Sequence, residues 1–159
     1  MCENEKVMGV TCDGVFAKYF VAPEVALTKI PDDMDKDLAI FAEPVKCVMG
    51  AMDWVRVLPG ETVLILGGGP IGLYFIMLMK ANGAGKIIVS EPSEYRAKYA
   101  MDCGADIIID PTKQNLAEEI AKITSGRGVD ISVDAVGVLI NDAIVNTCKG
   151  GRIVSVSYT

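Results

Sequence analysis

Residues 62–72 read Thr-Val-Leu-Ile-Leu-Gly-Gly-Gly-Pro-Ile-Gly, and this stretch decides the fold. An apolar, β-branched run leads into three glycines, and a long pattern of helical periodicity follows them. The spacing Gly67-x-Gly69-x-x-Gly72 is typical of a strand-to-helix turn that holds a dinucleotide. The first glycine permits the tight turn, the second lets backbone approach a pyrophosphate, and the third brings helix and strand together. Pro70 suits the first helical position, where its missing N–H costs no hydrogen bond.

Strands and helices alternate along the chain beyond this turn. Further apolar runs, each of four to six residues, stand at 86–90, 106–109, 130–135 and 152–157. Helical patterns separate them at 93–103, 115–126 and 139–148, the first two beginning at a capping Ser and Asn. Runs without strict polar alternation are typical of strands buried on both faces, and their alternation with helices indicates right-handed βαβ units. The sequence therefore predicts an α/β fold with a doubly wound parallel sheet of the Rossmann type.

Glu91 stands directly after the second run, 19 residues beyond Gly72. A carboxylate at that place accepts both ribose hydroxyls of an adenosine, and its charge repels a 2′-phosphate, so the sequence favours NAD over NADP. A bare glycine pattern also fits a tight turn with no ligand, and Glu91 alone fits a solvated acid at a strand end. It is the agreement of strand, helix and acid that favours nucleotide binding.

Composition excludes several classes of function. The 159 residues contain no histidine, so the chain has no Ser-His-Asp or Cys-His catalytic pair and no zinc site with imidazole ligands. Five scattered cysteines form no Cys-x-x-Cys pair, which argues against a zinc cage and indicates reduced thiols in a cytoplasmic protein. A net charge of −6 disfavours nucleic-acid partners, and no apolar stretch reaches the ~20 residues that span a membrane.

A resemblance to a known family rests on segments spread along the chain. They are Asp-Gly-Val-Phe-Ala-Lys-Tyr at 13–19, Glu-Pro at 43–44, the stretch 59–72, Gly-Arg-Gly-Val-Asp at 126–130 and Asp-Ala-Val-Gly at 134–137. In order and spacing, nearly the whole chain resembles the middle of a zinc-type medium-chain alcohol dehydrogenase. The similarity is greatest to the branch of sorbitol, butanediol and threonine dehydrogenases.

The resemblance implies that the chain is a piece of a longer enzyme. Family members carry a Cys, a His-Glu pair and often a four-cysteine zinc lobe in an amino-terminal half that has no counterpart in this sequence. We therefore expect residues 1–31 to be a remnant of the catalytic, GroES-like domain, with a short strand near 15–21. Residues 32–159 are expected to form the NAD-binding Rossmann domain, truncated before the sixth strand and so with five of six strands.

The resemblance also assigns cofactor contacts residue by residue. The contacts lie in the glycine turn and the start of its helix, at the acid that binds the ribose, at a basic residue on the next helix, after the fourth strand and at the end of the fifth strand. In that order the residues are Gly67, Gly69, Pro70, Ile71 and Gly72; Glu91; Arg96; Ala135, Val136 and Gly137; and Val156 and Ser157. Arg96 equally fits a solvated helix face, and Ser157 stands where the family commonly has glycine. Glu43 matches a catalytic residue beside the zinc in the sorbitol branch, but it cannot hold zinc alone and also fits an ordinary acid before a proline.

By resemblance, the parent enzyme transfers hydride between NAD and a small secondary alcohol or polyol, with zinc polarising the oxygen. Zinc belongs to the parent only, so the present chain is expected to bind NAD(H) without turning over. We also expect a homo-oligomer, because the run at 152–157 would form an edge strand with little protection against pairing.

Three alternatives share parts of this pattern. A stand-alone NAD-sensing regulatory module would have the same glycines and acid, but in a complete domain. A zinc-free quinone or enoyl reductase shares the fold but usually prefers NADP, which Glu91 opposes. A methyltransferase also has a glycine turn and an acid after its second strand, but it has no place for the segment at 134–137.

Overall fold

The structure, a computed structural model, describes residues 6–156. The chain divides into two compact units, residues 1–39 and residues 40–159. In the described part of the first unit, the helical elements are a short 3-10 helix, η1 (Glu24–Ala26), and a single helical turn, α1 (Lys36–Ala39). No side chain in this part is buried, so the described first unit has no hydrophobic core of its own.

The strand expected near residues 15–21 is not found, and this segment of the described structure is irregular. Phe16 and Val21 are almost fully exposed there. A strand needs a neighbour for its backbone hydrogen bonds, and even an isolated two-stranded hairpin is marginal in water. The strand-forming residues of this run therefore do not suffice to make a strand within this unit.

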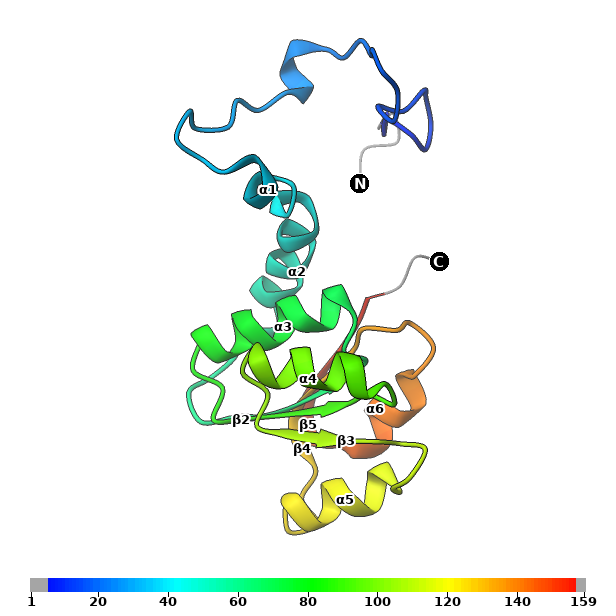
Figure 1. The fold of residues 1–159 in the computed structure, drawn as a ribbon. Helices are drawn as coiled ribbons and strands as arrows, with labels where there is room; N and C mark the ends of the chain where they lie inside the picture. The colour runs from blue at the N-terminus through cyan, green and yellow to red at the C-terminus, as the bar shows by residue number, and fades with distance from the viewer. Residues whose placement is uncertain (1–5, 157–159) are drawn as a thin grey trace. The chain divides into compact units, whose positions relative to one another are not determined.

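The second unit contains a five-stranded sheet in the order β3-β2-β1-β4-β5 (Figure 1). All neighbouring strands are parallel. The predicted α/β fold with a doubly wound parallel sheet is thus confirmed. The strand bounds are β1 (Thr62–Leu66), β2 (Lys86–Ser90), β3 (Ile107–Ile109), β4 (Val129–Asp134) and β5 (Thr147–Ser155).

Helices cover both faces of this sheet (Figure 1). Alternate residues of β1 serve the two faces: Val63 and Ile65 join the apolar cluster with α2, α3 and α4, whereas Leu64 and Leu66 join the cluster with α5 and α6. Both faces of the strand are therefore buried, which explains its unbroken apolar run. The helix bounds are α2 (Ala42–Val55), α3 (Pro70–Ala81), α4 (Glu94–Asp102), α5 (Leu116–Ile123) and α6 (Ile140–Asn146).

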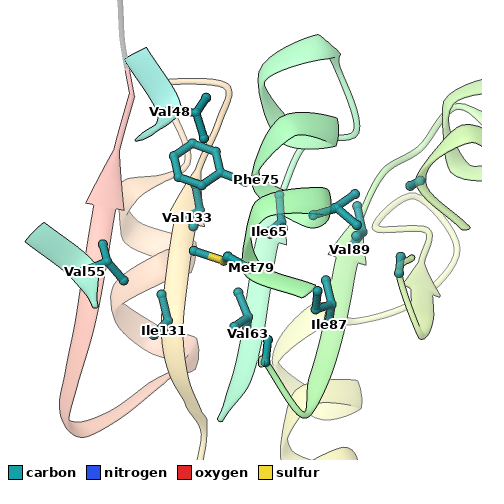
Figure 2. Close-up of a cluster of buried hydrophobic side chains, with 14 residues drawn as sticks. Val48, Val55, Val63, Ile65, Phe75, Met79, Ile87, Val89, Ile131 and Val133 are labelled. Carbon is teal, nitrogen blue, oxygen red and sulfur yellow. The ribbon is translucent and has the colours of Figure 1, made fainter. Parts of the chain in front are cut away.

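The larger cluster fixes α3 to the centre of the sheet (Figure 2). Phe75 and Met79 of α3 are wholly buried, as are Ile65 of β1 and Val133 of β4. Truncating such an aromatic side chain to alanine costs about 3–5 kcal/mol, because a cavity replaces its contacts. This layer therefore holds the start of α3, and with it the glycine turn, firmly beside β1.

β5 begins earlier than the sequence predicts. The helix expected over 139–148 ends at Asn146, and the strand starts at Thr147. Gly151 allows the first part of β5 to lie close to β4, since an added Cβ on Gly151 would lie 2.8 Å from the carbonyl oxygen of Asp130. The pairing of β4 with β5 accordingly shifts register between Val129 and Ile131.

The strand order creates a switch point between β1 and β4. The chain leaves β1 toward β2 and β3, and it then returns to the other side of β1 as β4. In open α/β sheets, ligands bind in the crevice outside the carboxyl ends of the strands at such a point. β1 ends at Leu66 and β4 ends at Asp134, so the segments that follow these two residues border the crevice.

Candidate functional site

The three glycines of the turn differ in what they allow. Gly67 has φ +98°, a left-handed conformation that favours glycine, and its N–H donates to the Ser90 carbonyl at 2.9 Å. An added Cβ on Gly72 would lie only 2.0 Å from the Gly67 oxygen, so the helix sits close to the strand. An added Cβ on Gly69 would meet nothing within 4 Å, and this residue caps α3. The open space at Gly69 is where the helix N-terminus can receive an anion.

Glu91 is held in place by backbone N–H groups. Its side chain is 2% exposed. One carboxylate oxygen accepts from the Gly68 N–H at 2.7 Å, the other accepts from the Ser93 N–H at 2.9 Å, and Nη1 of Arg96 lies 3.8 Å from the latter oxygen. An ionised carboxylate has about four acceptor sites, so these contacts leave capacity for further hydroxyl donors.

Gly68 is a site residue that the sequence analysis missed. An added Cβ there would lie 3.2 Å from both Cγ and Oε2 of Glu91. The middle glycine therefore gives Glu91 room, and its N–H orients the carboxylate. The signal was present in the sequence as a third consecutive glycine, but the dinucleotide pattern leaves that position open.

Six of the predicted residues come together around one cavity of about 490 Å³, the Glu91 cavity. They are joined by a serine and three apolar residues that the sequence analysis did not include. Its lining comprises Gly67, Gly69, Ser90, Glu91, Pro92, Arg96, Pro111, Ala135, Val136 and Leu139. One acid and one base in mostly apolar walls suit a ligand with an apolar body and a few polar groups.

A second cavity of about 290 Å³, the tyrosine cavity, adjoins it through Gly69 and Arg96. Tyr95 and Tyr99 line it from α4, with their ring centroids 5.0 Å apart in an edge-to-face arrangement. The hydroxyls of the two tyrosines lie 3.4 Å apart, and this hydrogen bond raises the pKa of Tyr99. Pro70, the predicted first residue of the helix, also lines this cavity.

The segment after β4 packs against the glycine turn. The Ala135 N–H donates to the Leu66 carbonyl at 3.0 Å. An added Cβ on Gly67 would lie 2.6 Å from Cγ2 of Val136, so the valine side chain occupies the space that the glycine leaves free. The two segments that border the crevice thus interlock.

Four further predicted cofactor residues do not line either cavity: Ile71, Gly72, Gly137 and Val156. Ile71 packs against the larger apolar cluster, and Gly137 donates its N–H to Asp134 at 2.7 Å. Val156 continues the line of β5, with its N–H donating to the Asp134 carbonyl at 2.9 Å. Ser157 lies outside the described residues.

Comparison with known proteins assigns the family. A family model described as zinc-binding dehydrogenase matches residues 70–159. The chain belongs to the zinc-binding dehydrogenase family. It is 42% identical over 139 residues to the L-threonine 3-dehydrogenase of Pyrococcus furiosus, with 86% of this chain and 39% of the relative covered. It is 38% identical over 157 residues to the enzyme of the same name from Thermococcus kodakarensis, with 96% and 44% covered.

Solved structures agree with this assignment of the zinc-binding dehydrogenase family. A protein of Sinorhizobium meliloti 1021, described as a zinc-binding dehydrogenase and bound to NADP, aligns with a TM-score of 0.89 at 31% identity, covering 98% of this chain and 46% of that one. An alcohol dehydrogenase of E. coli CFT073 complexed with NADH aligns with a TM-score of 0.88 at 28% identity, covering 99% and 48%. The chain spans less than half the length of these relatives. The resemblance inferred from the sequence is confirmed at the level of the family.

Residues for the zinc of this family are not assembled in the described part of the chain. Glu43 lies in the first turn of α2, exposed, and its carboxylate accepts a hydrogen bond from the Cys47 thiol at 3.5 Å. Desolvation and this hydrogen bond raise the pKa of Cys47. Within residues 6–156 no group of three or more His, Cys, Asp or Glu side chains could hold a metal ion. None of the helices described there is long and apolar enough to cross a membrane.

Proposed function

We propose that the second unit binds NAD(H) for a zinc-dependent dehydrogenase that transfers hydride between NAD and a secondary alcohol or polyol. The observation that carries this proposal is the open helix N-terminus at Gly69 next to a buried, hydrogen-bonded Glu91. In the proposed division, residues 1–31 are the remnant of the catalytic domain and residues 32–159 are the coenzyme domain.

The proposed pose places the adenosine half of the cofactor in the Glu91 cavity. The pyrophosphate would lie at Gly69, where backbone N–H groups and the helix dipole favour anions. The ribose hydroxyls would donate to Glu91, and the exposed Arg96 would approach the same ribose. The apolar residues Pro92, Pro111, Val136 and Leu139 would then enclose the adenine base.

The nicotinamide half would lie toward the end of β5, beside Ala135 and Val156, and the contact expected for Ser157 stays a prediction. The bound cofactor supplies the atom that accepts or donates hydride, and the chain's own residues only position it. Zinc does not fit the residues described at 6–156, because Glu43 is joined there by the Cys47 thiol and no group of three possible ligands is assembled. The proposed substrate is a small hydroxylated molecule, in line with relatives named L-threonine 3-dehydrogenase, scyllo-inosose 3-dehydrogenase and D-arabitol-phosphate dehydrogenase.

Two further properties belong to this proposal. The cysteines at positions 12, 47, 103 and 148 are free thiols in the described structure, which supports a reducing, cytoplasmic location. A homo-oligomer is proposed because β5 is an edge strand of the five-stranded sheet. Proposed partners are thus NAD(H), an alcohol or polyol in the parent enzyme, and a second copy of the chain.

The test is a fluorescence titration of the purified chain with NADH and NADPH, together with the variant Gly69→Val. Its Cβ has open space, so the variant should keep the fold, as judged by circular dichroism, and lose measurable NADH binding. Gly50→Val is the matched control, since an added Cβ there also meets nothing within 4 Å. Absence of NADH binding by the wild-type chain, or undiminished binding by Gly69→Val, would contradict the proposal.

A further inference from the structure

Asp134 is a wholly buried acid at the end of β4. One carboxylate oxygen accepts from the N–H groups of Val136 at 3.0 Å and Gly137 at 2.7 Å. The other oxygen accepts from the Leu139 N–H at 2.8 Å. Three backbone donors thus converge on one side chain, and among residues 6–156 no Lys or Arg forms an ion pair with it.

A buried carboxylate without a counter-ion is costly unless hydrogen bonds replace its hydration. Here each of the three bonds fixes one residue of the short segment between β4 and α6. Leu139 precedes α6 directly and has no side-chain cap, so the carboxylate also satisfies an N–H at the helix start. Asp134 therefore joins the strand, the segment and the helix at one point.

Two of these anchored residues line the Glu91 cavity. Val136 and Leu139 contribute apolar walls, and Val136 also packs onto Gly67 of the glycine turn. Val136 is 52% exposed, so packing on Gly67 alone does not enclose it. Its backbone N–H is in addition bound to the Asp134 carboxylate, at 3.0 Å.

We propose that Asp134 is a positioning residue for nucleotide binding, acting by holding Val136 and Leu139 as the apolar walls against the adenine base. This inference rests on the proposed NAD(H) function and deepens it. Aspartate suits the role because its carboxylate only accepts, whereas the amide of asparagine would turn an NH₂ group toward one of the N–H donors.

The test compares Asp134→Asn with Asp53→Asn, which makes the same chemical change at an exposed position of α2. Dissociation constants for NADH and for 5′-AMP are measured by titration, and folding is checked by circular dichroism. A hydrogen bond to a charged group contributes enough for its loss to weaken binding by about tenfold. Asp134→Asn should weaken both ligands by a similar factor of that size, because both carry the adenosine, and Asp53→Asn should leave both unchanged.

A double-mutant cycle with Val136→Ala separates positioning from a purely structural role. If Asp134 acts through the wall, Asp134→Asn should cost about threefold or less in AMP affinity once Val136 is already truncated. The inference would be overturned if the two substitutions weakened AMP binding independently, so that the loss in the double variant equalled the product of the two single losses. It would also be overturned if the Asp134→Asn variant bound AMP as the wild type does. Where Asp134→Asn fails to fold, Val136→Ala and Leu139→Ala decide: the inference fails if both bind AMP as wild type does.

The outcomes also separate this inference from the proposed function. A wild-type chain that binds neither NADH nor AMP refutes the function itself, and the inference falls with it. A wild-type chain that binds both while Asp134→Asn binds them equally well refutes only the role of Asp134.

Discussion

The glycine turn with Glu91 and the end of β5 both stand at the carboxyl edge of the sheet, yet they are built differently. Glu91 is 2% exposed, and backbone N–H groups hold both of its oxygens. At the end of β5, by contrast, Ser155 is exposed. The difference teaches that the described chain is most organised around the glycine turn and Glu91, where the adenosine half of the cofactor is proposed to bind, and less so at the end of β5.

The largest effect on stability is expected at Gly72, the most crowded position of the glycine turn. In Gly72→Ala, the new Cβ would lie 2.0 Å from the Gly67 carbonyl oxygen, which belongs to the backbone and cannot move aside. Overpacking of this kind costs about 1–3 kcal/mol or more and would separate α3 from β1. We expect the thermal midpoint to fall by about 5 °C or more, measured by circular dichroism. A Gly72→Ala variant that melts with the wild type would show that the turn is looser than described.

An intermediate effect is expected for Glu91→Ala, which removes the acid without crowding the turn. A hydrogen bond to a charged group contributes about 1.5–3 kcal/mol, so NADH binding should weaken by about 10- to 150-fold. The affinity for NADPH should fall less than the affinity for NADH, because the repulsion between the carboxylate and the 2′-phosphate disappears together with the carboxylate. Fluorescence titrations measure both ligands, and Glu94→Ala, an exposed acid three residues later, is the control. If the variant lost the same factor of affinity for NADH and for NADPH, Glu91 would not be the residue that distinguishes the two ligands.

The organised end was largely predictable from the sequence because its signals are local. The run at 62–66 and the helix after it follow from periodicity, and Ser93 and Asn115 do act as caps, accepting from N–H groups three residues ahead. The distance in sequence from the glycine turn to Glu91 is set by the length of one helix and one strand. These features depend on residues that are close together in the chain.

Features that depend on the direction of a side chain, or on contacts between residues far apart in the sequence, were not predictable. The role of Asp134 requires its side chain to turn back onto the following segment, which no periodicity encodes. The contact between Gly68 and Glu91 joins residues 23 positions apart. The run at 15–21 has strand-forming composition but no partner strand, so local propensity was misleading there.

The smallest effect is expected for substitutions in β5, where we predict a change in self-association. This edge strand carries two charges, the exposed Lys149 and Arg152, and the guanidinium of Arg152 is already engaged. It donates to the carbonyls of Val55 and Arg56 at the end of α2 and pairs with Glu61. A charge that faces its own chain does not guard an edge against a second strand.

We therefore expect weak, concentration-dependent self-association through β5, without a change in nucleotide affinity. Ile153 is 38% exposed on this strand, so Ile153→Lys should reduce association by placing an unpaired charge at the edge. Val145→Lys, on an exposed position of α6, is the control and should not. Size-exclusion chromatography with light scattering over a range of concentrations measures the effect. A wild-type monomer at high concentration, with rapid hydrogen exchange at Val154, would instead show that this edge strand needs no partner. The glycine turn and β5 would then differ in their chemistry but not in their tendency to self-associate.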